Sequence, residues 1–152
     1  MRRTVTLLLL LAYAAAVIVV TILPIQPHPD SYWAGIPWWT MIHWIPFVVD
    51  GASMVLNVIM FVPFGVLVPL VRPGADSVRR ILWSSLAASS VIEIVQLILG
   101  LTLGSRRTVD VNDLIANSAG ALTGLLLLRL AVPEAAHRAA LTRIGEGTRR
   151  SR

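Results

Sequence analysis

The stretch ASMVLNVIMFVPFGVLVPLV, residues 52–71, carries no charged side chain. A transmembrane helix needs about 20 consecutive apolar residues, and this stretch reaches that length. Pro63 and Pro69 do not exclude a helix, because neighbouring helices satisfy the backbone carbonyls that proline frees in a membrane. We expect Asp50 or Ser53 to cap its start and a bend near Pro63. The stretch therefore predicts a membrane-spanning helix.

Three further runs have the same apolar character, namely residues 5–23, 81–100 and 111–131. The first follows Arg2 and Arg3, as a signal peptide would, but no pair of small residues that would form a cleavage site follows it. We therefore expect it to remain as an uncleaved anchor. Together the four runs predict an all-α fold, an integral membrane bundle of four transmembrane helices.

The composition supports this class. Of 152 residues, 56% are hydrophobic and 14% are charged, and the mean hydropathy is +0.75. Soluble domains have roughly 25% charged residues. The absence of cysteine excludes disulfides, thiol catalysis and cysteine-ligated metal centres. The formal net charge of +5 would suggest nucleic acid, unless the basic residues have another purpose.

The arginines indicate how the chain is oriented. Eleven of the 13 basic residues lie in segments 1–4, 72–80 and 129–152, which four spans would place on one side. Only Arg106 and Arg107 lie on the other side. Because cytoplasmic segments are rich in arginine, both termini, the loop 72–80 and the tail 132–152 are predicted to be cytoplasmic. The basic residues are thus topology signals and not a nucleic-acid site, and the tail attracts anionic lipid headgroups weakly.

Two segments are then left on the outer side, residues 24–51 and residues 101–110. The longer one contains four of the five tryptophans, which are Trp33, Trp38, Trp39 and Trp44. Tryptophan gathers at membrane interfaces, so we expect this segment to lie on the outer membrane face. Its histidines, His28 and His43, do not have the spacing of a metal motif, and we predict neither a metal nor a cofactor.

Polar side chains of three predicted helices fall at one depth. With a rise of 1.5 Å per residue, Asn57, Glu93 and Asn117 lie roughly 6 to 10 Å from the outer ends of their helices. Helical spacing adds neighbours to each face. The predicted ligand-binding residues are Asn57, Glu93, Gln96, Arg107, Asp110, Asp113 and Asn117. The run 5–23 offers few polar groups, so we expect it to lie peripherally and mainly to anchor the chain.

Small residues predict how these helices pack. Gly120 and Gly124 form a G-x-x-x-G pattern, and Gly65 lies on the same face of its helix as Asn57 and Phe61. Such glycines let the backbones of two membrane helices approach closely. We therefore predict that Gly65, Gly120 and Gly124 are packing residues.

Glu93 allows two interpretations. An ionisable residue inside a membrane is costly and is a functional candidate by default. Glu93, with Asp113 as a second catalytic candidate, could carry a proton or act as a general acid or base. Alternatively, Glu93, Gln96 and the two asparagines hold the helices together by polar contacts. The residue types alone leave both interpretations open.

Three blocks of sequence match a known family: LNVIMFVPFG at residues 56–65, IEIVQ at 92–96 and RTVDVND at 107–113, followed by Asn117 and Gly120. They resemble the VanZ-like family of small bacterial membrane proteins, over about residues 50–130. The tryptophan-rich segment and the arginine tail lie outside this resemblance. Asn112 departs from the pattern, because the family often has a second aspartate there.

The resemblance implies a multi-pass protein of the bacterial cytoplasmic membrane, in a family whose founding member confers low-level resistance to the glycopeptide teicoplanin. Our first hypothesis is that the polar site binds or modulates a lipid-linked envelope component, such as a cell-wall precursor, or a lipid-anchored antibiotic. The second is a structural bundle, a homo-oligomer or a subunit of a larger membrane assembly. The third is an intramembrane enzyme, with Arg107 stabilising negative charge. We favour a protein that is not an enzyme, because the spans contain no histidine and no serine in a nucleophile motif.

Overall fold

The computed structural model describes residues 2–23, 37–48, 51–72, 74–103 and 109–131. In these ranges the chain forms four long helices, α1 (Arg2–Ile22), α2 (Gly51–Val71), α3 (Val78–Leu103) and α4 (Val111–Ala131). All four are long and apolar enough to cross a membrane. The predicted class, an all-α membrane bundle, is confirmed, and the chain is a multi-pass membrane protein.

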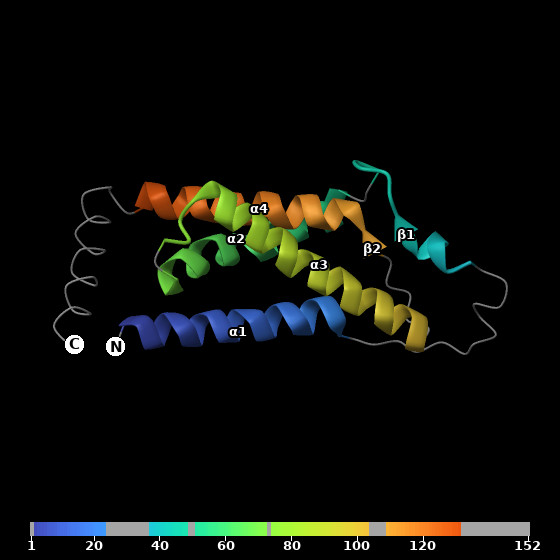
Figure 1. Ribbon diagram of the computed structural model, residues 1–152, viewed down its shortest axis with the longest axis horizontal. Helices are drawn as coiled ribbons and strands as arrows, with labels where there is room; N and C mark the ends of the chain where they lie inside the picture. Colours follow the sequence, from blue (N-terminus) through green and yellow to red (C-terminus); the bar gives the residue numbers. More distant parts are fainter. Residues whose placement is uncertain (1, 24–36, 49–50, 73, 104–108, 132–152) are drawn as a thin grey trace.

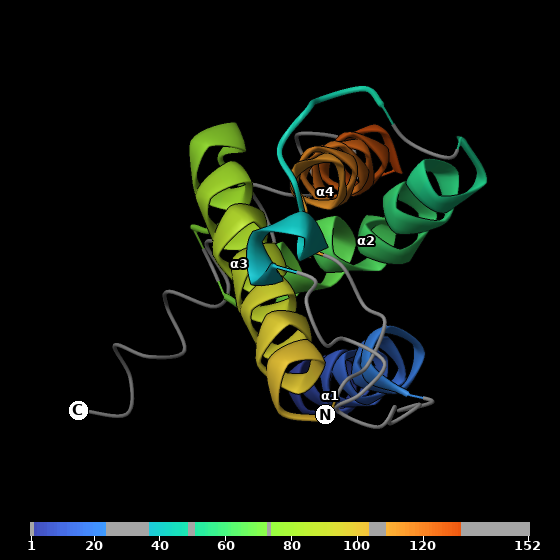
Figure 2. The same ribbon diagram turned by 90° about the vertical axis from the view of Figure 1, so that its right-hand side faces the viewer.

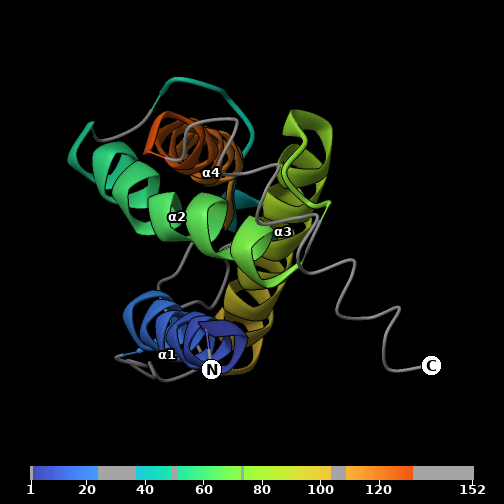
Figure 3. The same ribbon diagram turned by 90° about the vertical axis from the view of Figure 1, so that its left-hand side faces the viewer.

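The bundle has two distinct ends (Figure 1). The start of α1, the connection from α2 to α3 and the last turn of α4 lie together at one end, which Figure 3 views directly and which we call the α2–α3 end. The other end carries the short elements η2 (Trp38–Met41), β1 (Ile42–His43) and β2 (Val109–Asp110) (Figure 2). We call it the β1–β2 end. Helices α2 and α4 both run from the β1–β2 end to the α2–α3 end, whereas α3 crosses the bundle obliquely.

Helix α2 packs most closely against α4, and glycines make the approach possible. A Cβ atom on Gly120 would collide with the carbonyl oxygen of Val58, and one on Gly65 with that of Ala121. A Cβ on Gly124 would meet the Val62 carbonyl oxygen. Backbone therefore touches backbone at three positions along this crossing. Phe61, Ile81, Ala121 and Leu125 form the buried core beside it.

Helix α1 takes part in the bundle as well. The Tyr13 hydroxyl donates a hydrogen bond to the Met60 carbonyl of α2 at 2.9 Å. The Gln96 side chain of α3 donates to the Thr21 carbonyl of α1, also at 2.9 Å. The first helix lies at the periphery, as predicted, because most of its side chains are exposed, but it is also hydrogen-bonded to two other helices.

A short parallel pairing fixes the β1–β2 end. Ile42 pairs with Val109 and His43 with Asp110. The first strand belongs to the tryptophan-rich segment and the second lies directly before α4. The segment predicted to rest on the membrane face is thus tied, over these residues, to the start of a transmembrane helix.

Candidate functional site

A pocket of about 450 Å³ opens between the four helices near the β1–β2 end. Its polar lining comes mainly from Asn57 on α2, Glu93 and Gln96 on α3, and Asp113 and Asn117 on α4. Glu93, Gln96 and Asn117 are only 4%, 7% and 2% exposed. The structure thus gathers five of the seven predicted ligand-binding residues in one buried site, which we call the polar pocket.

Hydrogen bonds connect elements of the fold across the polar pocket. The Asn57 amide donates to Asp113 Oδ1 at 2.5 Å, which joins α2 to α4. The carboxyl groups of Asp113 on α4 and Glu93 on α3 line the same pocket. Glu93 Oε2 also accepts the backbone N–H of Asp110 at 3.1 Å.

Only one of the two polar atoms of the Asn117 side chain has a hydrogen-bond partner among the described residues. Its Nδ2 group donates to Ser89 Oγ at 2.8 Å. Its Oδ1 atom is buried and has no hydrogen-bond partner among the described residues. Leaving a buried acceptor unpaired costs about 1–3 kcal/mol. Asn117 also belongs to the lining of the polar pocket, so the unpaired acceptor lies on one of its lining residues.

Asp110 lies beside the polar pocket and caps the start of α4. Its Oδ1 accepts the backbone N–H of Asn112 at 2.8 Å, the contact by which an aspartate caps a helix start, here that of α4. His43 Nδ1 lies 3.6 Å from Asp110 Oδ2. Asp110 is thus held by its neighbours at the pocket's edge and is not one of the residues that line it.

Sequence reasoning missed the role of Asn112, which is fully buried. Its Oδ1 accepts the N–H of Phe47 at 2.6 Å, and its Nδ2 donates to the Ile45 carbonyl at 3.3 Å. Phe47 has a φ of 66°, a conformation that a bulky residue rarely adopts. An amide can both donate and accept here, whereas an aspartate could only accept. The departure of Asn112 from the family pattern was the only sequence signal for this role.

A comparison with protein-family models finds a match to VanZ/LLP1 over residues 10–132. The chain belongs to the VanZ/LLP1 family. This confirms the resemblance drawn from the three sequence blocks and extends it, because the match includes most of α1 and the tryptophan-rich segment 24–51. Neither the curated proteins nor the solved structures contain a match to this VanZ/LLP1 chain.

The remaining predicted site residues of the VanZ/LLP1 chain lie elsewhere. Gly65, Gly120 and Gly124 lie at the α2–α4 crossing. Arg107 lies outside the described residues, as do Arg106, Asp50 and His28. Among the described residues that line the polar pocket there is no basic side chain. This part of the site therefore offers carboxyl and amide groups but no cation.

The rim of the polar pocket is apolar. Val20 of α1 and Leu56 and Ile59 of α2 belong to its lining, and each is largely exposed. In a membrane, such side chains contact hydrocarbon. The VanZ/LLP1 chain thus combines a polar interior with a lipid-facing opening between α1 and α2.

Proposed function

We propose that this VanZ/LLP1 protein binds the headgroup of a lipid-linked component of the bacterial envelope in the polar pocket. The observation that carries the proposal is the unpaired, buried Oδ1 atom of Asn117 in a pocket that opens to lipid. Buried polar atoms are almost always hydrogen-bonded in folded proteins. A headgroup that donates a hydrogen bond to Asn117 would remove the energetic cost of leaving its Oδ1 atom unpaired.

The chemistry of the lining supports a ligand rich in hydrogen-bond donors. Two carboxyl groups, those of Glu93 and Asp113, belong to the lining, and the described lining has no basic side chain to oppose them. A phosphate in direct contact with this pair would be repelled. Hydroxyl groups of a sugar, or an amine, would instead find acceptors on Asp113 and Asn117. The proposed ligand therefore presents hydroxyl or amine groups to the polar pocket.

The apolar rim supports a ligand that carries a hydrocarbon chain. Small-molecule sites typically pair apolar walls with a few well-placed polar groups. Here the chain of the lipid would lie against Leu56 and Ile59, and its headgroup would turn inward. With the cytoplasmic termini that the arginines predict, this entry lies in the outer leaflet. A lipid-anchored antibiotic with exposed hydroxyl groups would present the same chemistry, and resistance to such a drug would follow from its capture.

A structural role is the alternative, supported by the glycine contacts between α2 and α4. These contacts account for the closeness of two helices. They give no reason for a polar cavity of about 450 Å³ whose lining includes an unpaired acceptor. Lipid binding explains both the cavity and the acceptor, so we place it ahead of the structural role.

The proposal is tested by analysing lipid that co-purifies with the full chain. Protein expressed in a bacterial host is purified in mild detergent, and bound lipid is identified by native mass spectrometry. We expect a lipid with a hydroxyl- or amine-bearing headgroup. Asn117→Leu and Glu93→Gln should reduce its occupancy roughly tenfold, or about 1.4 kcal/mol of binding free energy. Thr123→Val, which alters an exposed residue of α4 that bonds only within its own helix in the described structure, is the control.

Two results would contradict the proposal. One is wild-type protein that carries no lipid through purification. The other is equal occupancy in wild type and in folded Glu93→Gln protein. Glu93→Gln guards against misfolding as an explanation, because glutamine can still accept the Asp110 N–H.

A further inference from the structure

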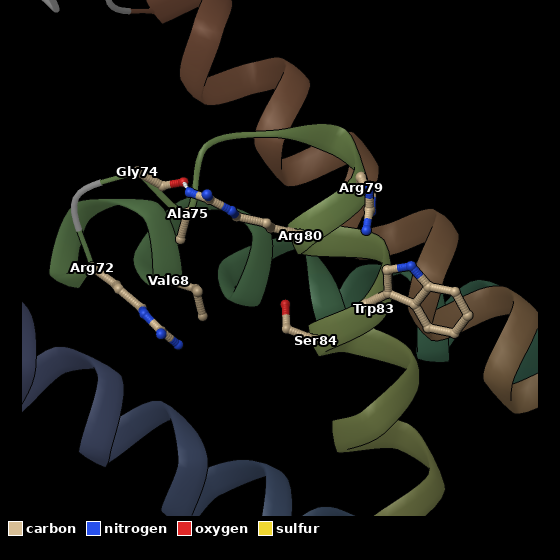
Figure 4. A pocket seen from close by; sticks show the side chains of 8 residues that line it. All are labelled: Val68, Arg72, Gly74, Ala75, Arg79, Arg80, Trp83 and Ser84. Atoms are coloured by element: carbon tan, nitrogen blue, oxygen red, sulfur yellow. Dashed lines mark hydrogen bonds between the residues drawn. The ribbon is translucent and has the colours of Figure 1, made fainter.

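A second cleft lies at the opposite end of the bundle. It has a volume of about 640 Å³, and its lining includes Arg72 at the end of α2 and Arg79 and Arg80 at the start of α3 (Figure 4). We call it the arginine cleft. Arg80 and Glu93 are separated along α3 by about 20 Å, at 1.5 Å per residue. The arginine cleft shares no lining residue with the polar pocket.

The arginine cleft is positively charged. The connection 72–80 contains three arginines and one acidic residue, Asp76. The Arg80 guanidinium donates to the Gly74 carbonyl, and Arg129 of α4 donates to the Asp76 carbonyl. Carbonyl acceptors carry no net charge, so the bond from Arg80 positions its guanidinium group, which belongs to the lining, without itself neutralising it. The cleft therefore favours an anion.

The backbone around the arginine cleft is defined by short-range hydrogen bonds. The Ala75 N–H donates to the Arg72 carbonyl at 3.0 Å, and Gly74 has a φ of 85°, which glycine adopts readily. Ser77 Oγ accepts the N–H of Arg80 at 3.3 Å and caps the start of α3. The positive end of the α3 dipole is thus directed toward the same cleft. The helix dipole and the arginines therefore both favour a negatively charged ligand.

One wall of the arginine cleft is apolar. Val68 and Trp83 belong to its lining, and Trp83 is 64% exposed. Tryptophan is enriched at the level of lipid headgroups. Figure 4 shows Arg79 beside Trp83 on α3, with Arg72 reaching from α2 toward the space between the helices. Charge and apolar surface therefore adjoin at one membrane face.

We propose that the arginine cleft binds a phosphate group at this membrane face, through the guanidinium groups of its lining. Guanidinium groups bind phosphate through paired, charge-assisted hydrogen bonds. The phosphate belongs either to an anionic lipid headgroup or to a free phosphate compound, and Trp83 favours the lipid. Arginines that served only as topology signals would need no cleft. The proposal does not depend on the polar pocket and concerns residues at the other end of α3.

The test measures phosphate binding by the full chain in neutral detergent. Native mass spectrometry compares phosphatidylglycerol with phosphatidylcholine, and inorganic phosphate is added as a competitor. We expect phosphatidylglycerol to bind at least about tenfold more tightly. Arg72→Gln with Arg79→Gln should abolish this preference. Arg143→Gln with Arg149→Gln removes the same charge from the tail and should change it less than twofold.

Each outcome is decisive. A preference for phosphatidylglycerol that the cleft variant alone loses supports the lipid as the source. Cleft-dependent binding of inorganic phosphate, with no preference between the two lipids, supports a free phosphate compound. Equal weakening in the cleft and tail variants, or no weakening in either, overturns the proposal. Unfolding temperatures without added lipid confirm that the cleft variant is folded, and unchanged lipid occupancy at the polar pocket separates this result from the proposed function.

Discussion

The Asn57 amide on α2 lies 2.5 Å from the Asp113 carboxylate on α4, although the two residues are 56 positions apart in the chain. The same two helices touch through Gly65, Gly120 and Gly124. The polar pocket is therefore formed where close backbone packing brings polar side chains within reach of each other. The packing of α2 against α4 and the arrangement of the polar side chains depend on the same helix crossing. Substitutions at the glycines and at Asn57 test these two features separately.

Replacing Asn57 with leucine should destabilise the bundle through loss of this hydrogen bond. Hydrogen bonds between membrane helices average about 0.6 kcal/mol and reach about 1.7 kcal/mol in double-mutant cycles. We expect a loss near the upper figure, because Asp113 would keep its partly buried carboxylate without the amide donor. The measurement is thermal unfolding in detergent. Val55→Leu, on the exposed side of α2, should leave the unfolding temperature unchanged.

Alanine substitutions at the glycines of the α2–α4 crossing should destabilise the bundle more than the loss of the Asn57 hydrogen bond does. Gly120→Ala and Gly65→Ala each place a Cβ atom where a backbone carbonyl of the partner helix lies. Because backbone cannot move aside as a side chain can, each variant should lose about 1–3 kcal/mol of stability, as overpacked cores do. Gly51→Ala is the matched control, since a Cβ there meets nothing within 4 Å. Equal unfolding temperatures for all three variants would refute the close crossing.

Asn112→Ala should release the end of the tryptophan-rich segment locally. The substitution leaves the Phe47 N–H and the Ile45 carbonyl without their partner, and each unpaired group costs about 1–3 kcal/mol where it is buried. Phe47, held at a φ of 66°, should then relax. Hydrogen exchange should rise at residues 45–48 while α2 and α3 stay protected. Unchanged exchange at residues 45–48 would mean that Asn112 does not hold the segment.

The sequence predicted the four helices because long apolar runs with at most two charged residues have few alternatives. It also placed Asn57, Glu93 and Asn117 at one depth, since helical spacing converts residue number directly into depth and face. The pairing of His43 with Asp110 could not be foreseen, because two-residue strands far apart in sequence leave no periodic pattern. The contact from Gln96 to α1 was hidden for another reason. Its acceptor is the backbone carbonyl of Thr21, a group that every residue carries.

The orientation of the bundle remains a prediction from the arginine count. The chain lacks cysteine, so single cysteines can report which side a residue occupies. Single cysteines are placed at Gly35, Val78, Gly104 and Gly147. An impermeant reagent added to intact cells should label the cysteines at Gly35 and Gly104, which are predicted to lie outside, and should not label those at Val78 and Gly147. Val78 is preferable to Gly74, whose φ of 85° would strain a side chain. External labelling at Val78 would move the polar pocket to the inner leaflet.

Two substitutions of Glu93 distinguish a functional role of this residue from a packing role. Glu93→Gln can keep the bond from the Asp110 N–H, but it removes the ionisable carboxyl group. Glu93→Leu removes all polarity. Stability should therefore be nearly unchanged in Glu93→Gln and reduced by about 1 kcal/mol or more in Glu93→Leu. Thermal unfolding of each purified variant measures this difference.

The same variants are then compared in cells by an envelope-stress or glycopeptide-susceptibility assay. If the charge of Glu93 serves the function, Glu93→Gln should abolish the phenotype in folded protein, and Asp113→Asn and Arg107→Gln should do the same. If Glu93 only holds helices together, Glu93→Gln should keep the phenotype and Glu93→Leu should lose it with its stability. A phenotype that follows the amount of folded protein across all four variants would favour the structural role, because no single side chain would then matter beyond its contribution to packing.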